Sequence, residues 1–210
     1  ALFRRHLMNV YRLLRLDIPP ELQEPIKKKG PAGLVREPAA LITPQINGRV
    51  DNYFEWLAAG LYDLTRQSST MHASENLLQS FFFGFDRDTL YFRLDGATPL
   101  DRTLQSGDEL ALHLICDNEF RLVMGIAAGS SRLMVRDGQW RDAGWECHWQ
   151  IGVICEIASP LAAVAALPGR QVFAYVTLRR NGEEVGRWPT DSPLIITYRG
   201  EELELDNWLI

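Results

Sequence analysis

Tryptophan is the residue type in this sequence whose number and placement point most directly to chemistry. The chain contains six Trp, six Tyr and nine Phe residues. Trp140 and Trp145 flank an Arg-Asp-Ala-Gly loop, and Trp188 precedes a proline. Flat indole faces stack on the C–H faces of sugars through apolar and polarised contacts. We therefore name Trp140, Trp145 and Trp188 as candidate carbohydrate-binding residues.

Some of these indoles also suit a packed core. Trp145 and Trp149 lie on the apolar side of an alternating run, so we expect both to be buried. Trp140 lies between Gln139 and Arg141 beside a turn. We expect Trp140 to be the better exposed candidate.

Histidines and carboxylates are weaker candidates. The four histidines show no spacing typical of a metal site; they are His6, His72, His113 and His148. We expect His113 and His148 to be surface residues on the polar faces of their strands. Neighbouring acids occur in two places, Asp51 with Glu55 and Asp86 with Asp88. Because acids that share a turn are usually solvated, we expect no catalytic residue and no cofactor in this chain, and a metal site is left undefined.

Composition and charge exclude several classes of protein. With 210 residues, 46% hydrophobic and 23% charged, the chain matches one globular domain with at most a small appendage. Its net charge of −5 gives no basic field for a phosphate backbone, so we expect no nucleic-acid partner. No apolar stretch reaches the ~20 residues of a bilayer span, so we expect a cytoplasmic protein without a membrane partner. The three cysteines predict small core residues rather than a disulfide framework.

The first thirty residues predict a helical appendage. Apolar residues between Leu2 and Leu16 recur at spacings of three and four, which is typical of one helical face. Residues 31–37 follow a lysine run and contain glycine and proline, so we expect a linker there and a separate domain over residues 38–210. Because the chain starts at Ala1 and enters this helix at once, we expect it to be a piece of a longer protein.

From residue 38 onward the hydrophobic period changes from 3.6 to 2. Alternating apolar residues predict strands over residues 89–95, 109–116, 120–126 and 172–178. A longer alternating run covers residues 145–157, where we expect a bend or bulge near Gly152. Turn signals at Asp137-Gly138 and Asn181-Gly182 predict hairpins, and Ser159-Pro160 predicts a short helix over residues 161–167. Many short strands separated by turns favour an all-β antiparallel sandwich, jelly-roll-like in character.

Two long segments carry a resemblance to a known family. Residues 44–60 (PQINGRVDNYFEWLAAG), Met71-His72 and residues 83–95 (FGFDRDTLYFRLD) resemble the C-terminal region of glycoside hydrolase family 57 proteins. In that family a helix similar to residues 3–11 (FRRHLMNVY) closes the catalytic part. The resemblance implies an α-glucan-active parent enzyme whose catalytic acids lie upstream, so that this chain is not an enzyme by itself.

Shorter pieces are similar to carbohydrate-binding module family 9 and its DOMON-like relatives. They are Ile46-Asn47-Gly48, the "Gly-Phe-Asp…Leu-Tyr" stretch at residues 84–91, and residues 156–161 (EIASPL). The resemblance implies a noncatalytic β-sandwich that binds α-glucan or maltooligosaccharide, or that braces the catalytic domain of the parent chain.

An alternative is a haem-binding redox module, because some DOMON-like sandwiches hold haem between methionine and histidine. Met71 and His72 are adjacent and cannot ligate opposite faces of one iron.

Overall fold

The computed structural model describes residues 11, 13–14, 35–66, 77–125, 128–164, 168–200 and 202–205. The chain divides into two compact units, Ala1–Leu34 and Val35–Ile210. In the first unit Tyr11 and Leu13 are helical and Leu14 lies in a turn, and the other residues of the predicted helix lie outside the described residues, as do Met71 and His72. The second unit begins at Val35, slightly before the predicted start at residue 38.

The second unit is an antiparallel all-β fold, which confirms the predicted fold class. Twelve strands are present in the described part of the chain, and every pair is antiparallel. The strands are β1 (Val35–Arg36), β2 (Gly60–Asp63), β3 (Leu78–Phe85), β4 (Thr89–Gly96), β5 (Asp108–Ile115), β6 (Glu119–Met124), β7 (Ala128–Asp137), β8 (Gln139–Ile151), β9 (Ile154–Pro160), β10 (Gln171–Arg180), β11 (Glu183–Trp188) and β12 (Leu194–Thr197).

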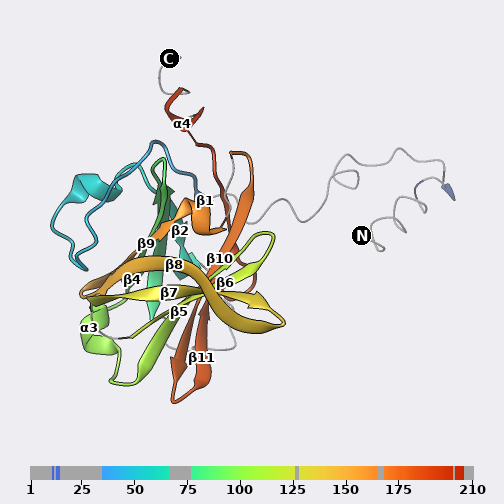
Figure 1. Cartoon of the computed structure of the whole chain (residues 1–210). Helices are drawn as coiled ribbons and strands as arrows, with labels where there is room; N and C mark the ends of the chain where they lie inside the picture. The colour runs from blue at the N-terminus through green and yellow to red at the C-terminus, as the bar shows by residue number, and fades with distance from the viewer. Residues whose placement is uncertain are drawn as a thin grey trace. The chain divides into compact units, whose positions relative to one another are not determined.

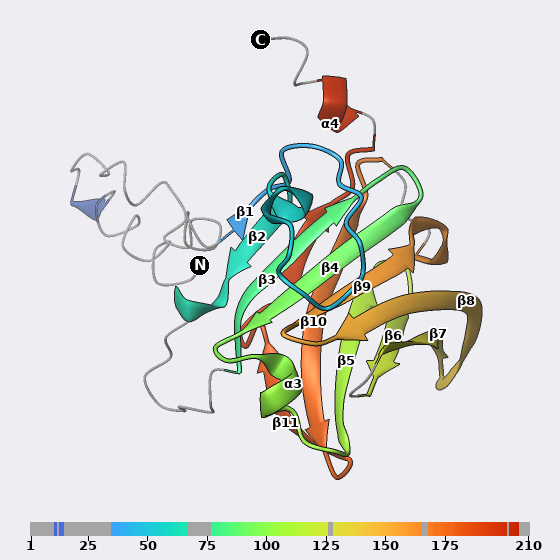
Figure 2. The ribbon, with the colours of Figure 1, turned by 90° about the vertical axis from the view of Figure 1, so that its left-hand side faces the viewer.

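The strands follow one continuous hydrogen-bonded path. Their order is β1-β2-β3-β4-β9-β8-β7-β6-β5-β10-β11, and β12 pairs with the other end of β10. The sheet curls, so that β3, β4 and β9 form one layer and β5, β6 and β10 form another (Figures 1 and 2). The fold is therefore sandwich-like, but its two layers belong to the same curled sheet.

The core fills the space between the two layers. Phe81 and Phe92 come from one layer, and Leu112, Leu122 and Val176 come from the other; all are fully buried in one cluster. Because side chains alternate along a strand, the residues between these positions face outward on both layers. Side chains that can contact a ligand therefore lie on the two outer faces.

Local turns mostly follow the sequence prediction. Asn181 and Gly182 both have positive φ, 51° and 84°, and connect β10 to β11. Gly138, with a φ of 70°, connects β7 to β8. Of the helix predicted over residues 161–167, the first four residues form the 3₁₀ turn η3 (Leu161–Val164), and residues 165–167 lie outside the described residues.

The prediction of one long bent strand over residues 145–157 is wrong. A turn at Gly152 and Val153 divides this run into β8 and β9, which pair with each other, Ile151 opposite Cys155. The alternation survives because the residues of both strands that face the core are apolar. A two-residue turn therefore leaves almost no trace in the hydrophobic pattern.

Residues 37–59, here called the strap, cross the outer face of the first layer (Figure 2). The strap contains the 3₁₀ turn η1 (Tyr53–Trp56), and a second such turn, η2 (Leu64–Arg66), follows β2. Ile42, Trp56 and Ala59 of the strap form a separate small buried cluster against Phe82 and Tyr91. The first layer is thus covered on both sides by the chain itself.

The helical content of the sheet unit is small. Two four-residue helices are described, α3 (Leu100–Thr103) and α4 (Glu202–Leu205). Among the described residues, none of the helices has the length and apolar character that crossing a membrane requires.

Candidate functional site

Three outward-facing residues on neighbouring strands form one row across the second layer. Tyr175 of β10 lies opposite His113 of β5, and His113 lies opposite Arg121 of β6. Directly opposite residues on antiparallel strands have Cβ atoms about 5 Å apart, so their side chains touch. Strand alternation and register together therefore place a phenol, an imidazole and a guanidinium side by side.

Ring contacts extend this row at both ends. The Tyr175 and His113 rings are stacked, with centroids 4.4 Å apart and an interplanar angle of 5°. The Arg187 guanidinium lies 4.1 Å from the centre of the Tyr175 ring, and the Arg121 guanidinium lies 4.2 Å from the centre of the Trp140 ring. We call these five residues, Arg187, Tyr175, His113, Arg121 and Trp140, the outer ladder.

The outer ladder contains buried polar atoms that the chain does not use. His113 is only 9% exposed, and its Nε2 lies 3.2 Å from the Thr177 hydroxyl. Its Nδ1 and the Nε of Arg121 are buried and have no hydrogen-bond partner in the described part of the structure. Most buried polar groups in proteins are satisfied, so two such atoms in one row require an explanation.

His113 is held neutral by its surroundings. Burial lowers the pKa of His113 to about 4; Arg121, Arg187 and Arg179 also lower it, and Glu119 opposes the shift. A neutral imidazole with one nitrogen on Thr177 has its other nitrogen free to donate or accept. Burial also raises the pKa of Tyr175, so its phenol stays protonated at neutral pH.

The two arginines of the outer ladder form no ion pair with a carboxylate in the described part of the chain. Among the described residues, neither Arg121 nor Arg187 belongs to an ion pair. The nearby Arg136 does belong to one, since its guanidinium lies 2.9 Å from the Glu119 carboxylate. The outer ladder thus combines planar rings, unused hydrogen-bonding atoms and positive charge.

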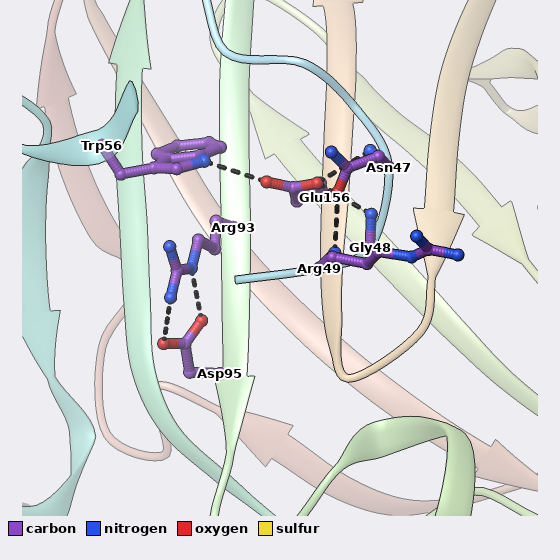
Figure 3. Close-up of polar contacts among 7 residues, drawn as sticks. All are labelled: Asn47, Gly48, Arg49, Trp56, Arg93, Asp95 and Glu156. Carbon is purple, nitrogen blue, oxygen red and sulfur yellow. Dashed lines mark hydrogen bonds and ion pairs between the residues drawn. The ribbon is translucent and has the colours of Figure 1, made fainter. Parts of the chain in front are cut away.

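The outer face of the first layer has an opposite arrangement, centred on Glu156 of β9 (Figure 3). Glu156 is 1% exposed, and its Oε2 accepts hydrogen bonds from the backbone amides of Asn47 and Gly48, both at 2.9 Å. Its Oε1 accepts a hydrogen bond from the Trp56 indole at 2.9 Å. We call Glu156 with these three partners the clamp, because it ties the strap to the sheet.

Next to the clamp, Arg93 is also satisfied within the chain. It lies opposite Glu156 in the sheet and binds both carboxylate oxygens of Asp95, at 2.7 and 2.8 Å. Its guanidinium also lies over the Phe82 ring. The polar atoms of this region are occupied by the protein itself, so we assign it a structural role.

The three predicted tryptophans are not brought together. Trp188 is 7% exposed and belongs to the core, so its ring is not available to a ligand. Trp140 is half-buried beneath Arg121 in the outer ladder. Trp145 is 40% exposed, so the expectation that it is a core residue is wrong, whereas Trp149 is buried as expected.

The exposure of Trp145 has a local cause. β8 is irregular where it faces the register shift between Arg132 and Met134 of β7. Trp145 lies in this irregular part, next to Gly144 with its φ of 80°. The alternation that buries Trp149 is interrupted before it reaches Trp145.

The histidines and acids differ in how well they follow the sequence prediction. His148 is exposed as expected, whereas His113 is buried, because the neighbouring ladder side chains cover it. Cys147 and Cys155 are buried as expected. Asp86 forms part of a turn and accepts hydrogen bonds from the amides of Asp88 and Thr89. Within the described ranges, no cluster of three His, Cys, Asp or Glu side chains has the geometry of a metal site.

Searches against protein-family models and against curated proteins find no match to this chain. Support for the outer ladder as a functional site therefore comes from its geometry alone.

Proposed function

We propose that the sheet unit is a noncatalytic carbohydrate-binding module of a larger glycan-active protein, and that the outer ladder is its sugar contact. The observation that carries this proposal is the row of stacked planar side chains with buried nitrogen atoms that lack partners. Such a row is preorganised, because each ring is held by its neighbours before any ligand arrives. Preorganisation reduces the entropy cost of binding.

The chemistry of the outer ladder suits sugars. A sugar ring presents hydroxyl groups at its edge and C–H groups on its faces. The Tyr175 hydroxyl can donate hydrogen bonds to sugar hydroxyls or accept hydrogen bonds from them, and the Arg121 guanidinium can donate hydrogen bonds to them. The half-buried Trp140 indole provides an apolar surface beside them.

The identity of the sugar follows from the resemblance of residues 44–60 and 83–95 to family 57 glycoside hydrolases. We propose α-glucan or maltooligosaccharide as the ligand and a cytoplasmic glycoside hydrolase as the parent enzyme. The catalytic acids of that enzyme would belong to its other part, and this module would hold substrate near them.

Calorimetry of the full chain against maltooligosaccharides, cellooligosaccharides and xylooligosaccharides tests the proposal. We expect millimolar-to-micromolar affinity for at least one series, lowered at least tenfold by Trp140→Ala. Trp145→Ala is the matched control, because it removes an exposed indole outside the outer ladder. Loss of binding in Trp145→Ala but not in Trp140→Ala would place the binding site at Trp145. No heat with any of these neutral sugars would overturn α-glucan as the ligand, and no heat with acidic oligosaccharides either would overturn the carbohydrate-binding proposal.

A bracing role is the second candidate, and a separate surface favours it. Val50, Tyr53, Phe54 and Leu57 of the strap are between 47% and 76% exposed. Contiguous exposed apolar side chains mark interaction surfaces. We propose the catalytic domain of the parent enzyme as their partner. If Tyr53→Ser with Phe54→Ser lowers the melting temperature of the parent enzyme but not that of this chain, bracing is supported.

A further inference from the structure

The charge pattern of the second layer indicates which sugars the outer ladder prefers. Arg179 lies opposite Glu109 on β5 and opposite Glu184 on β11, and Arg136 is paired with Glu119. Arg136 is thus neutralised by an ion pair, and Arg179 has an acid directly across from it on both neighbouring strands. Arg121 lies opposite His113 on one side and Met134 on the other, and Arg187 lies opposite Thr177. Neither arginine therefore has an acid directly across from it in the sheet.

The two free guanidinium groups lie at opposite sides of the stacked pair. Arg187 belongs to β11 and Arg121 to β6, with β10 and β5 between them. Neighbouring strands are about 4.8 Å apart, so the two positions are separated by roughly 14 Å across the sheet. One small anion cannot reach both groups. A linear ligand with acidic groups along its length can.

The middle of the row consists of two neutral rings, and the nearby Glu119 carboxylate, 3.9 Å from Nδ1 of His113, is paired with Arg136. His113 is neutral, and the Tyr175 phenol is protonated. A ligand that crosses the row from Arg187 to Arg121 therefore meets a cation, two neutral polar rings and a second cation. Acidic oligosaccharides have this alternation, because carboxylates are separated along the chain by neutral hydroxyls.

We infer that the outer ladder binds a linear acidic oligosaccharide, with carboxylates on Arg187 and Arg121 and a hydroxyl group on the Tyr175 phenol between them. This inference rests on the proposed carbohydrate-binding function, and it replaces α-glucan or maltooligosaccharide with a uronate-containing sugar as the ligand of the outer ladder.

The test compares tetragalacturonate with maltotetraose, two tetrasaccharides that differ in charge, by calorimetry on the full chain at low and high sodium chloride. We expect the acidic sugar to bind at least tenfold more tightly at low salt, and its affinity to fall as salt rises because exposed ion pairs are screened. Arg121→Gln and Arg187→Gln should each weaken acidic binding about tenfold and reduce its salt dependence. Arg49→Gln removes an exposed arginine from the strap and should change neither.

The alternative outcomes are distinct. Equal affinity for both sugars, abolished by Trp140→Ala, overturns the acidic preference and leaves the carbohydrate-binding proposal standing. Binding of neither sugar overturns both. A single-stranded oligonucleotide that binds more tightly than tetragalacturonate at the same salt would replace an acidic sugar with a nucleic acid. Circular dichroism of each variant shows whether a lost signal reflects unfolding.

Discussion

The clamp and the outer ladder occupy the outer faces of two layers of one sheet, and they treat buried polar groups in opposite ways. In the clamp, both oxygens of Glu156 accept hydrogen bonds from the strap. In the outer ladder, Nδ1 of His113 and Nε of Arg121 are buried without a partner. The first face is completed by its own chain. The second retains two buried groups that the described part of the chain leaves unsatisfied.

This difference separates structural from functional polar residues. Glu156 is the more deeply buried charged group, and burial alone would make it the stronger candidate for a functional site. Its three hydrogen-bond donors all belong to the strap: two are backbone amides and the third is the Trp56 indole. The hydrogen-bonding capacity of Glu156 therefore already serves the fold. Unsatisfied atoms, rather than burial, distinguish the outer ladder.

The largest expected effect concerns Glu156. Glu156→Ala leaves two backbone amides and one indole N–H without their acceptor, so the free energy of unfolding should fall by about 3–5 kcal/mol. Urea denaturation measures this change. Glu146→Gln, which removes an exposed charge from the neighbouring strand, should change it by less than about 0.5 kcal/mol. Equal effects in the two variants would contradict the structural role of the clamp.

The second effect is a pH dependence that comes from the outer ladder. The pKa of His113 is about 4 in the folded protein, below the ordinary value of 6.5. Between these values the unfolded chain binds the proton more readily, so stability falls as pH drops from 6.5 to 4, by up to roughly 3 kcal/mol. His113→Gln should remove this part of the pH dependence, and His148→Gln should preserve it. Denaturation at several pH values in this interval provides the measurement.

The third effect compares two glycines with similar φ angles. Gly48 in the strap and Gly138 in the β7–β8 turn have φ of 72° and 70°. A Cβ on Gly48 would lie 2.7 Å from Gln150 and 2.9 Å from the Gly152 nitrogen, whereas one on Gly138 would meet open space. Gly48→Ala should therefore destabilise by about 2–4 kcal/mol and Gly138→Ala by about 1–2 kcal/mol. Similar losses in thermal or urea unfolding would show that the strap is not packed tightly at the clamp.

The strands β4, β5, β6 and β10 could be predicted from sequence because their inner faces are apolar at every second residue. The mostly exposed β11 has no such pattern and was not predicted. The hairpins at Asp137-Gly138 and Asn181-Gly182 carried their own turn chemistry. The division of residues 145–157 could not be predicted, because the turn at Gly152 and Val153 preserves the alternation.

The outer ladder was only partly accessible to sequence reasoning. The β5–β6 hairpin could be predicted from sequence, but the pairing of His113 with Arg121 depends on a turn at residues 116–118, one residue earlier than the predicted strands 109–116 and 120–126 imply. The placement of Tyr175 beside His113 depends on pairing between β10 and β5, which are far apart in sequence. The number and placement of tryptophans predicted Trp188 as a sugar-binding residue, but its ring lies in the core. For the clamp, alternation with Cys155 and Ile157 places Glu156 on the outer face, but its burial depends on the strap, which the sequence pattern did not predict.

The smallest expected effect is the change in the free energy of unfolding when Arg121 is replaced. It contrasts most sharply with the large effect expected for Glu156 in the clamp. Arg121→Met keeps an unbranched side chain over Trp140 but removes the charge and the buried Nε. The lost cation–π contact costs about 0.5–1 kcal/mol, and removal of an unsatisfied buried donor returns a similar amount. The free energy of unfolding should therefore change by less than about 0.5 kcal/mol in urea denaturation. A loss as large as that of Glu156→Ala would mean that Arg121 holds the fold together, and the two faces would then be alike.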